Sequence, residues 1–394
     1  MTSLQDNNNT LSDTSIEYIA ELPYADIPSL YPQNHAANLL PLGNGDLLCV
    51  WFGGTQEGMS DISVMMSRLP AGTMVWDAPI QLSDDPTRSE QNPILFRAPD
   101  ARLWLLYTAQ KSGNQDTSIV RRRISDNDGQ TWGPVEDLFT QPGTFVREPP
   151  VILENGDLLL PLFYCCTQPG EKWVGNNDIS AVKISTDGGL SWSEVEVPNS
   201  VGCVHMGIQQ LNDGSLIALY RSRWADWIYC SRSEDNGRTW SEPEPTELPN
   251  NNSSIQFVKL HNGHLALVYN HSQADEQTER RVSLYDEIED EDDSATLPDL
   301  ANMQQRSAFW GTPRAPMSIA LSSDGGRSWQ YKRDIMRGDG YCMTNNSERK
   351  LNREFSYPSV TQAADGRIHV AFTYHRQFIR HFVLDEAWIK QTGN

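Results

Sequence analysis

An eight-residue turn motif, Ser-x-Asp-x-Gly-x-x-Trp, recurs along this chain and restricts its fold more than any other feature. Four copies are clear, and they begin at Ser125, Ser185, Ser233 and Ser322. The third position is Asp in three copies and Asn127 in the first. A short carboxylate or amide caps its own turn, the glycine adopts a positive φ, and the tryptophan packs the turn onto a sheet. The motif therefore predicts structural hairpin turns, not catalytic sites.

A second motif, a polar two-residue turn followed by an apolar run, occurs six times. The turns are residues 44–45, 100–101, 155–156, 213–214, 262–263 and 365–366. Asn-Gly and Asp-Gly before a strand-like run are strong hairpin signals. The two motifs alternate, with a degenerate Trp turn in the first unit (Ser67 to Trp76) and none in the sixth. Six units in this phase predict an all-β chain, a six-bladed β-propeller with four-stranded antiparallel blades.

The regular repetition predicts one closed domain, residues 21–394, although 394 residues could form two or three average domains. Residues 1–20 are expected to be a disordered tail, because the first fifteen are rich in Asn, Asp, Ser and Thr. Blade five contains a long insertion, about residues 271–310, with an acidic run from Asp286 to Asp293. This composition favours a solvated loop over a functional lid.

The overall charge restricts the partners of the chain. The formal net charge of −21 disfavours nucleic acid and anionic membranes as partners. The N-terminus lacks the pattern of a signal peptide, and no apolar stretch approaches the roughly 18 residues that span a bilayer, so a cytoplasmic protein is expected. The six cysteines show no metal-ligand spacing and are expected to be buried thiols. Neither a metal nor a cofactor is expected, and the oligomeric state stays open.

The Trp-containing turns are the ones called Asp boxes in sialidases, and residues 30 to 390 resemble the exo-sialidase superfamily. The resemblance implies an exo-acting glycoside hydrolase that removes a terminal carboxylate-bearing sugar, sialic acid or a related one, with a tyrosine nucleophile. Sialidases bind the carboxylate with three arginines, because a guanidinium can donate two hydrogen bonds to it. Arg221 or Arg223 stands at the second of these positions and Arg314 at the third. At the first, the chain has His35, which can also donate to a carboxylate or transfer a proton.

The resemblance also assigns candidates for the chemical step. Tyr357, in Glu-Phe-Ser-Tyr-Pro-Ser-Val, is the candidate nucleophile. His205 stands where the family has its activating glutamate, and a histidine can serve as the base for a tyrosine. For the general acid, the Gly-rich segment 53–61 offers Glu57 by spacing or Asp61 by residue type, and either would need a raised pKa.

Further polar residues fall where strands are expected to begin around a central mouth. They are Arg147, Arg353 and Asn252 with its neighbour Asn251, and each is a candidate substrate contact or a structural residue. Together the basic side chains would make one end of an acidic protein locally basic, which suits an acidic glycan. Two alternatives stay open. The same His, Tyr and Arg residues would suit a lyase that removes the C5 proton of a uronate by β-elimination, and a propeller that binds a glycan without turnover is the other.

Overall fold

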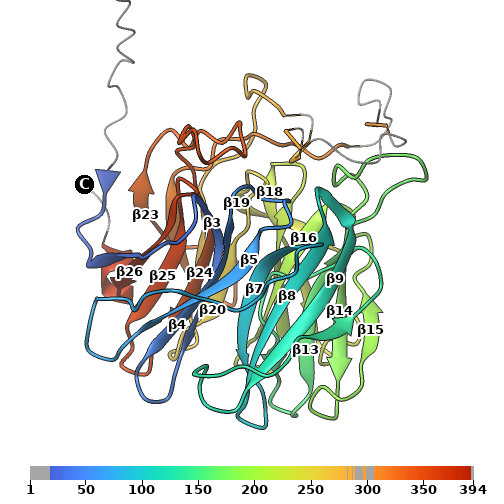
Figure 1. Cartoon of the computed structure of the whole chain (residues 1–394). Coiled ribbons are helices and arrows are strands. Elements are labelled where there is room, and N and C mark those ends of the chain that lie inside the picture. Colours follow the sequence, from blue (N-terminus) through green and yellow to red (C-terminus); the bar gives the residue numbers. More distant parts are fainter. Residues whose placement is uncertain (1–17, 282, 286, 289–295, 299–305, 392–394) are drawn as a thin grey trace, which may run out of the picture.

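The computed structural model describes residues 18–391, except 282, 286, 289–295 and 299–305. Six antiparallel sheets are arranged around a central axis, as Figure 1 shows, and form a six-bladed β-propeller. The predicted fold is therefore confirmed. From the axis outward, the strands of blades one to four follow the chain order, while blades five and six each gain an outer strand from residues 18–27. The innermost strands of blades six, one and two contact one another in turn, as do those of blades four, five and six.

The first three blades comprise residues 33–196. Blade one contains β3 (Gln33–Pro41), β4 (Leu47–Gly54), β5 (Ser63–Leu69) and β6 (Ile80–Gln81). Blade two contains β7 (Ser89–Arg97), β8 (Leu103–Lys111), β9 (Asn114–Ser125) and β10 (Glu136–Phe139). In blade three, two short inner strands pair with the same neighbour; its strands are β11 (Thr144–Phe145), β12 (Val151–Ile152), β13 (Leu158–Tyr164), β14 (Ile179–Ser185) and β15 (Ser193–Glu196).

The last three blades comprise residues 203–384 and one strand from the N-terminal end. Blade four contains β16 (Cys203–Gln210), β17 (Leu216–Ser222), β18 (Trp227–Ser233) and β19 (Glu244–Pro249). Blade five contains β20 (Gln256–Lys259), β21 (Leu265–Asn270), β22 (Met317–Ser322) and β23 (Tyr331–Arg337). Blade six contains β24 (Phe355–Gln362), β25 (Ile368–Tyr374), β26 (Phe378–Leu384) and β2 (Tyr24–Ile27).

The N-terminal strands close the ring. Strand β2 pairs with β26 and supplies the outer strand of blade six, while β1 (Tyr18–Ile19) extends blade five by pairing with β23. The expected tail therefore ends earlier than residue 20, because residues 18–19 form backbone pairs with a sheet edge; residues 1–17 lie outside the described residues. The short helix α1 (Glu386–Lys390) packs against β22 and β23. Pairing the two ends of the chain leaves only short, protected sheet edges.

Both repeated motifs lie at the same end of the propeller. The six polar turns join the first and second strands of each blade, and the four Asp boxes join the third and fourth strands, as predicted. Because successive strands are antiparallel, both sets of turns lie opposite the end where the innermost strands begin. We call that other end the mouth. In Figure 1 the hairpin turns lie at the bottom and the loops of the mouth at the top.

Each Asp box also joins two blades, which its sequence did not reveal. Within all four boxes, the serine hydroxyl accepts a hydrogen bond of 2.8–2.9 Å from the amide of the glycine four residues later. Each of these glycines lies against the second strand of the preceding blade, and a Cβ on Gly189 would lie 2.3 Å from Trp104. The close approach is what requires glycine at this position.

The described part of the blade-five insertion covers the mouth instead of forming a solvated loop. Tyr285 and Trp310 are buried in an apolar cluster with Trp173 and Phe163 from blade three. The expectation of a solvated loop is therefore wrong for these residues, because the sequence did not show that blade three offers an apolar surface to them. Most of the acidic run lies outside the described residues.

All six cysteines carry free thiols; Cys166 and Cys230 are partly exposed and the other four are buried. Among the described residues, no helix has the length and apolar character needed to cross a membrane.

Candidate active site

The innermost strands carry a repeated distortion near the mouth. One non-glycine residue with positive φ lies in the innermost strand of four blades, Ala36, Asn92, His205 or Tyr357, and in blade five Asn252 lies just before β20. In four of these blades a shift in the strand register marks a β-bulge at the same place. Positive φ costs a non-glycine residue about 1–3 kcal/mol and is often found at functional sites. Three of the five residues are candidates predicted from sequence.

Tyr357 lies at the centre of this region, and its side chain is buried. Arg221, at the end of β17, donates a hydrogen bond from Nη1 to the Tyr357 hydroxyl at 2.6 Å. The guanidinium carbons of Arg147, Arg221 and Arg314 each lie 5.6 Å from the centre of the Tyr357 ring. The structure therefore brings together one tyrosine and three arginines from four different blades.

Two histidines lie on either side of Tyr357. The His35 ring centre is 4.1 Å from that of Tyr357, and the His205 ring approaches it edge-on at 5.7 Å. Burial lowers the pKa of both histidines well below the usual value, and the neighbouring arginines, above all Arg376 for His35 and Arg221 for His205, lower it further. Both imidazoles are therefore neutral at physiological pH.

Several donors in this centre have no partner in the described protein. Arg221 Nη2, Arg147 Nη1 and His35 Nε2 are buried without a hydrogen bond. The other donors of Arg147 are used, because Nε binds Ser254 Oγ and Nη2 binds the carbonyl oxygens of Ala37 and Pro358. An unpaired buried donor costs about 1–3 kcal/mol, and more for a charged group, so the centre is suited to an acceptor such as an anion.

The positive charge of Arg314 is already compensated. Its Nη1 is 3.0 Å from Glu354, which also pairs with Arg376, and Arg376 in turn pairs with Glu57. Although burial favours the neutral form of Glu354, Arg376 and Arg314 together lower its pKa. This chain of alternating charges connects the segment 53–61 to the centre.

Arg221 and Arg147, in contrast, form no ion pair with any described carboxylate. Burial, together with Arg223 and Arg314, lowers the pKa of Arg221 to about 9, although Tyr357 opposes the change. Glu148 is next to Arg147 in sequence, but burial raises its pKa to about 8, so it is mostly neutral at pH 7. Two uncompensated guanidinium groups therefore give the centre its positive charge.

The remaining candidates lie outside this centre. Glu57 is buried in its pair with Arg376, and Asp61 is exposed and accepts hydrogen bonds from Thr55, so neither is placed as a free acid beside Tyr357. Arg223 pairs with Asp178 at 2.7 Å and stacks near Trp310. Arg353, a candidate substrate contact or structural residue, is partly exposed and pairs with Asp339.

The amides serve as supports. Asn252 accepts a hydrogen bond from Arg221 Nε at 2.8 Å and donates one to the carbonyl of Phe309, so it positions Arg221 and leaves little for a substrate. Asn251 donates to the carbonyl of Pro313.

Two hydroxyl residues that sequence reasoning missed support the histidines. Ser254 Oγ lies 3.0 Å from His205 Nδ1, and Thr373 Oγ1 lies 2.9 Å from His35 Nδ1. Ser254 stands nine residues before Gly263 of its polar turn, the spacing that also separates Tyr357 from Gly366 and His205 from Gly214. Counting back from each turn would therefore have found Ser254.

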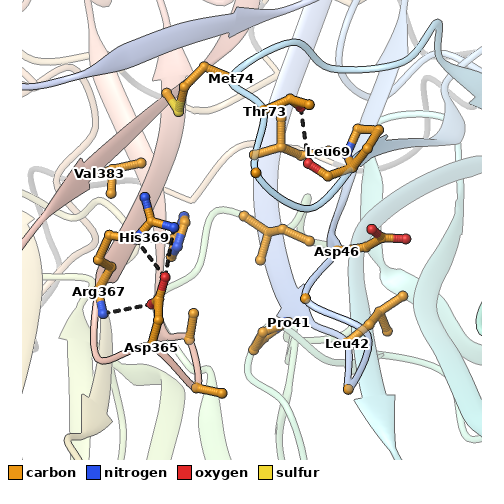
Figure 2. A pocket seen from close by; sticks show the side chains of 17 residues that line it. Pro41, Leu42, Asp46, Leu69, Thr73, Met74, Asp365, Arg367, His369 and Val383 are labelled. Carbon is orange, nitrogen blue, oxygen red and sulfur yellow. Dashed lines mark hydrogen bonds and ion pairs between the residues drawn. The ribbon is translucent and has the colours of Figure 1, made fainter.

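An open pocket lies at the opposite end of the propeller, far from Tyr357. Figure 2 shows it between blades six and one, where residues 363–369 face residues 41–47 and 69–74. Residues of the degenerate Trp turn of blade one line it, and Trp76 of that turn packs edge-on against His381 of blade six. Its most polar lining, Asp365 and Arg367, is an exposed ion pair. The pocket has none of the buried unpaired donors of the centre.

A family model agrees with the repeats. The model of the BNR repeat-like domain matches residues 45–370, most of the chain. The chain belongs to the family of BNR repeat-like domains. No curated protein matches this BNR-repeat chain.

Solved structures resemble the BNR-repeat chain over nearly its whole length. A Hadza microbial sialidase has a TM-score of 0.64 at 12% identity, covering 91% of this chain and 66% of its own. A leech intramolecular trans-sialidase has a TM-score of 0.64 at 13% identity, covering 94% of this chain and 71% of its own. The intramolecular trans-sialidase from Ruminococcus gnavus has a TM-score of 0.62 at 14% identity, covering 96% of this chain and 99% of its own. At such identities the likeness shows the fold, a sialidase-type propeller.

Proposed function

We propose that this BNR-repeat propeller is an exo-acting glycoside hydrolase of the sialidase type that removes a terminal sugar bearing a carboxylate. The observation that carries the proposal is the pair of buried, unpaired and uncompensated donors, Arg221 Nη2 and Arg147 Nη1, beside the Tyr357 hydroxyl. A carboxylate would accept hydrogen bonds from both and neutralise charge in a buried place. The similar solved structures include sialidases and trans-sialidases, which supports a substrate of this kind.

In this reaction Tyr357 attacks the anomeric carbon and forms a covalent glycosyl-enzyme, which water then hydrolyses with net retention. Arg221 donates to the tyrosine oxygen at 2.6 Å, so it stabilises negative charge that develops there when the hydroxyl loses its proton. His205, neutral and 3.3 Å from the same Arg221 nitrogen, takes this proton. The leaving oxygen receives its proton from a protonated carboxyl group in the segment 53–61, either Glu57, once it has separated from Arg376 and taken up a proton from solvent, or Asp61, once it is protonated and turns inward.

A second reaction, β-elimination on a uronate, is favoured by the state of the carboxyl groups. Glu57 and Glu354 are engaged with Arg376, and Asp61 points to Thr55. Glu148 is buried and accepts a hydrogen bond from the Gln256 side chain. A lyase needs none of these acids, because the arginines would neutralise the uronate carboxylate while a histidine or Tyr357 exchanges protons with the sugar.

One screen tests both reactions. Purified protein is incubated with sialosides, ketodeoxy-acid glycosides and uronate-capped oligosaccharides, and each mixture is analysed for released sugar and for an unsaturated product that absorbs in the ultraviolet. The hydrolase proposal expects released acidic sugar without unsaturation. Unsaturated product would show that the protein is a lyase and not a hydrolase. Binding without any product would show that it is a glycan-binding propeller without turnover.

Tyr357→Phe separates a chemical role of the hydroxyl from a structural one. The variant keeps the ring packed against His35 and removes only the group that Arg221 contacts. We expect turnover to fall by at least about 100-fold while substrate still binds, since the hydroxyl takes part in the chemical step. Tyr331→Phe, on the exposed outer strand β23, is the matched control and should keep full activity. Unchanged turnover in Tyr357→Phe would exclude the hydrolase reaction with Tyr357 as the nucleophile.

A further inference from the structure

The hydrogen bonds of His205 specify which of its ring nitrogens carries a proton. His205 Nε2 lies 3.3 Å from Arg221 Nη1, and a guanidinium can only donate, so Nε2 must be the acceptor. A neutral imidazole carries one proton, which is therefore on Nδ1 and is donated to Ser254 Oγ at 3.0 Å. Ser254 Oγ also accepts from Arg147 Nε at 3.1 Å, and its own hydrogen can reach the carbonyl of Ile255 at 3.5 Å. With this tautomer, each donor in the chain of hydrogen bonds faces an acceptor.

The hydrogen bonds of His35 lead to the opposite arrangement. His35 Nδ1 lies 2.9 Å from Thr373 Oγ1, which also accepts the amide hydrogen of Ala36 at 3.2 Å. Thr373 is completely buried, and His35 Nδ1 is the acceptor that the described residues offer to its hydroxyl hydrogen. If Nδ1 instead carried the proton, both that hydrogen and Nε2 would be left unsatisfied. With the proton on Nε2 one unpaired group remains, so this tautomer avoids a cost of about 1–3 kcal/mol.

We propose that the two histidines around Tyr357 are held in opposite tautomers, His205 with an unprotonated Nε2 that accepts from Arg221 and His35 with a proton at Nε2, and that Arg221 and Thr373 impose them. Burial and the arginines keep both rings neutral, which the assignment requires. One side of the centre then presents three unpaired donors, His35 Nε2, Arg221 Nη2 and Arg147 Nη1, to an anionic group. On the other side, His205 Nε2 carries no proton and accepts a hydrogen bond from Arg221 Nη1 at 3.3 Å.

The two tautomers give each histidine a separate role in catalysis, and these roles rest on the proposed function. His35 binds an oxygen of the acidic sugar as an uncharged donor, at the position that resembles the first of the three sialidase arginines. His205 is the proton acceptor for the chemical step. Thr373 is a positioning residue, because it acts only by directing the proton of His35.

Nitrogen NMR on histidine-labelled protein tests the proposal without any substrate. The chain has eight histidines, and His35→Gln and His205→Gln variants assign the two sets of ring signals. At pH 7 the expected spectrum has a protonated Nδ1 and a bare Nε2 in His205, and the reverse in His35. The same tautomer in both rings, or two protonated nitrogens in either, would overturn the proposal. Because no turnover is measured, this result is independent of whether the enzyme proves to be a hydrolase.

Variants at Thr373 test which group sets the tautomer of His35. Thr373→Val keeps the size of the side chain and removes the hydroxyl, so the His35 signals should shift to a mixture of both tautomers, while His205 keeps its own. Thr373→Ser retains a hydroxyl and should restore the wild-type pattern. His35 signals that stay unchanged in Thr373→Val would show that Thr373 does not set the tautomer. If Thr373→Val fails to fold, the wild-type and Thr373→Ser spectra still decide the assignment.

Discussion

A pair of buried histidines in blade six makes the stability of the protein depend on pH in a way that can be calculated. His369 Nδ1 lies 2.9 Å from His381 Nε2, with the two rings stacked. Burial lowers the pKa of His369 to about 4 and that of His381 to about 3. In the unfolded chain both titrate near 6.5, so the unfolded state binds these protons first. Their stabilising contribution is therefore complete above pH 6.5 and is lost as pH falls toward 4 and 3.

The magnitude follows from the shifted pKa values. Between pH 7 and pH 5 each histidine should lower the free energy of unfolding by about 2 kcal/mol, or about 4 kcal/mol for the pair. The double variant His369→Gln/His381→Gln removes this term, whatever its stability at pH 7. Urea unfolding followed by tryptophan fluorescence at the two pH values measures the loss in the wild type and in the variant.

A variant at an exposed histidine controls for the loss of any histidine from the chain. His261→Gln, on the exposed turn between β20 and β21, should leave the loss between pH 7 and pH 5 at its wild-type value. Carboxyl groups elsewhere contribute equally to all three proteins and cancel in the comparison. If the double variant loses as much stability as the wild type, the two histidines are not buried as neutral groups and the reasoning from burial is wrong.

Two further predictions concern the packing between blades and the buried charges. Gly189→Ala would place a Cβ 2.3 Å from Trp104, whereas Gly188 also has positive φ but open space around it. We expect Gly189→Ala to lower the free energy of unfolding by about 1–3 kcal/mol more than Gly188→Ala, and equal losses in urea unfolding would contradict the close packing of the Asp box. Glu354→Gln removes the carboxylate that Arg314 and Arg376 share, and should lower the free energy of unfolding by about 3–5 kcal/mol. Asp365→Asn, which breaks the exposed ion pair with Arg367, is the control and should lower the free energy of unfolding by at most about 1 kcal/mol. Similar losses in the Glu354 and Asp365 variants would contradict a buried network of charges.

The fold could be predicted because both repeated motifs are local. A turn needs only a few adjacent residues, so Asn44-Gly45 or the box at Ser185 can be recognised without knowledge of the rest of the chain. The same frame locates much of the candidate site, since Arg147, His205 and Tyr357 each stand nine residues before the second residue of a polar turn. Repetition thus predicts which residues the innermost strands direct to the axis.

The supporting contacts could not be predicted, because they join segments far apart in sequence. Arg376 joins Glu57 of blade one to Glu354, which precedes blade six, and no local pattern indicates such a pair. Arg221 and Arg223 stand two residues apart, and only the position of Asp178 shows which of them is removed from the centre. The unmet expectation for a free acid in segment 53–61 has the same cause.

The most direct test of the proposed function compares an acidic substrate with its carboxyl-reduced analogue. The substrate is whichever terminal acidic glycoside the screen identifies, and in the analogue a primary alcohol replaces the carboxylate. We expect kcat/KM to fall by at least about 100-fold on the analogue, because Arg221 and Arg147 are left buried without an anionic partner. Equal cleavage of the two compounds would contradict recognition of a carboxylate by this centre.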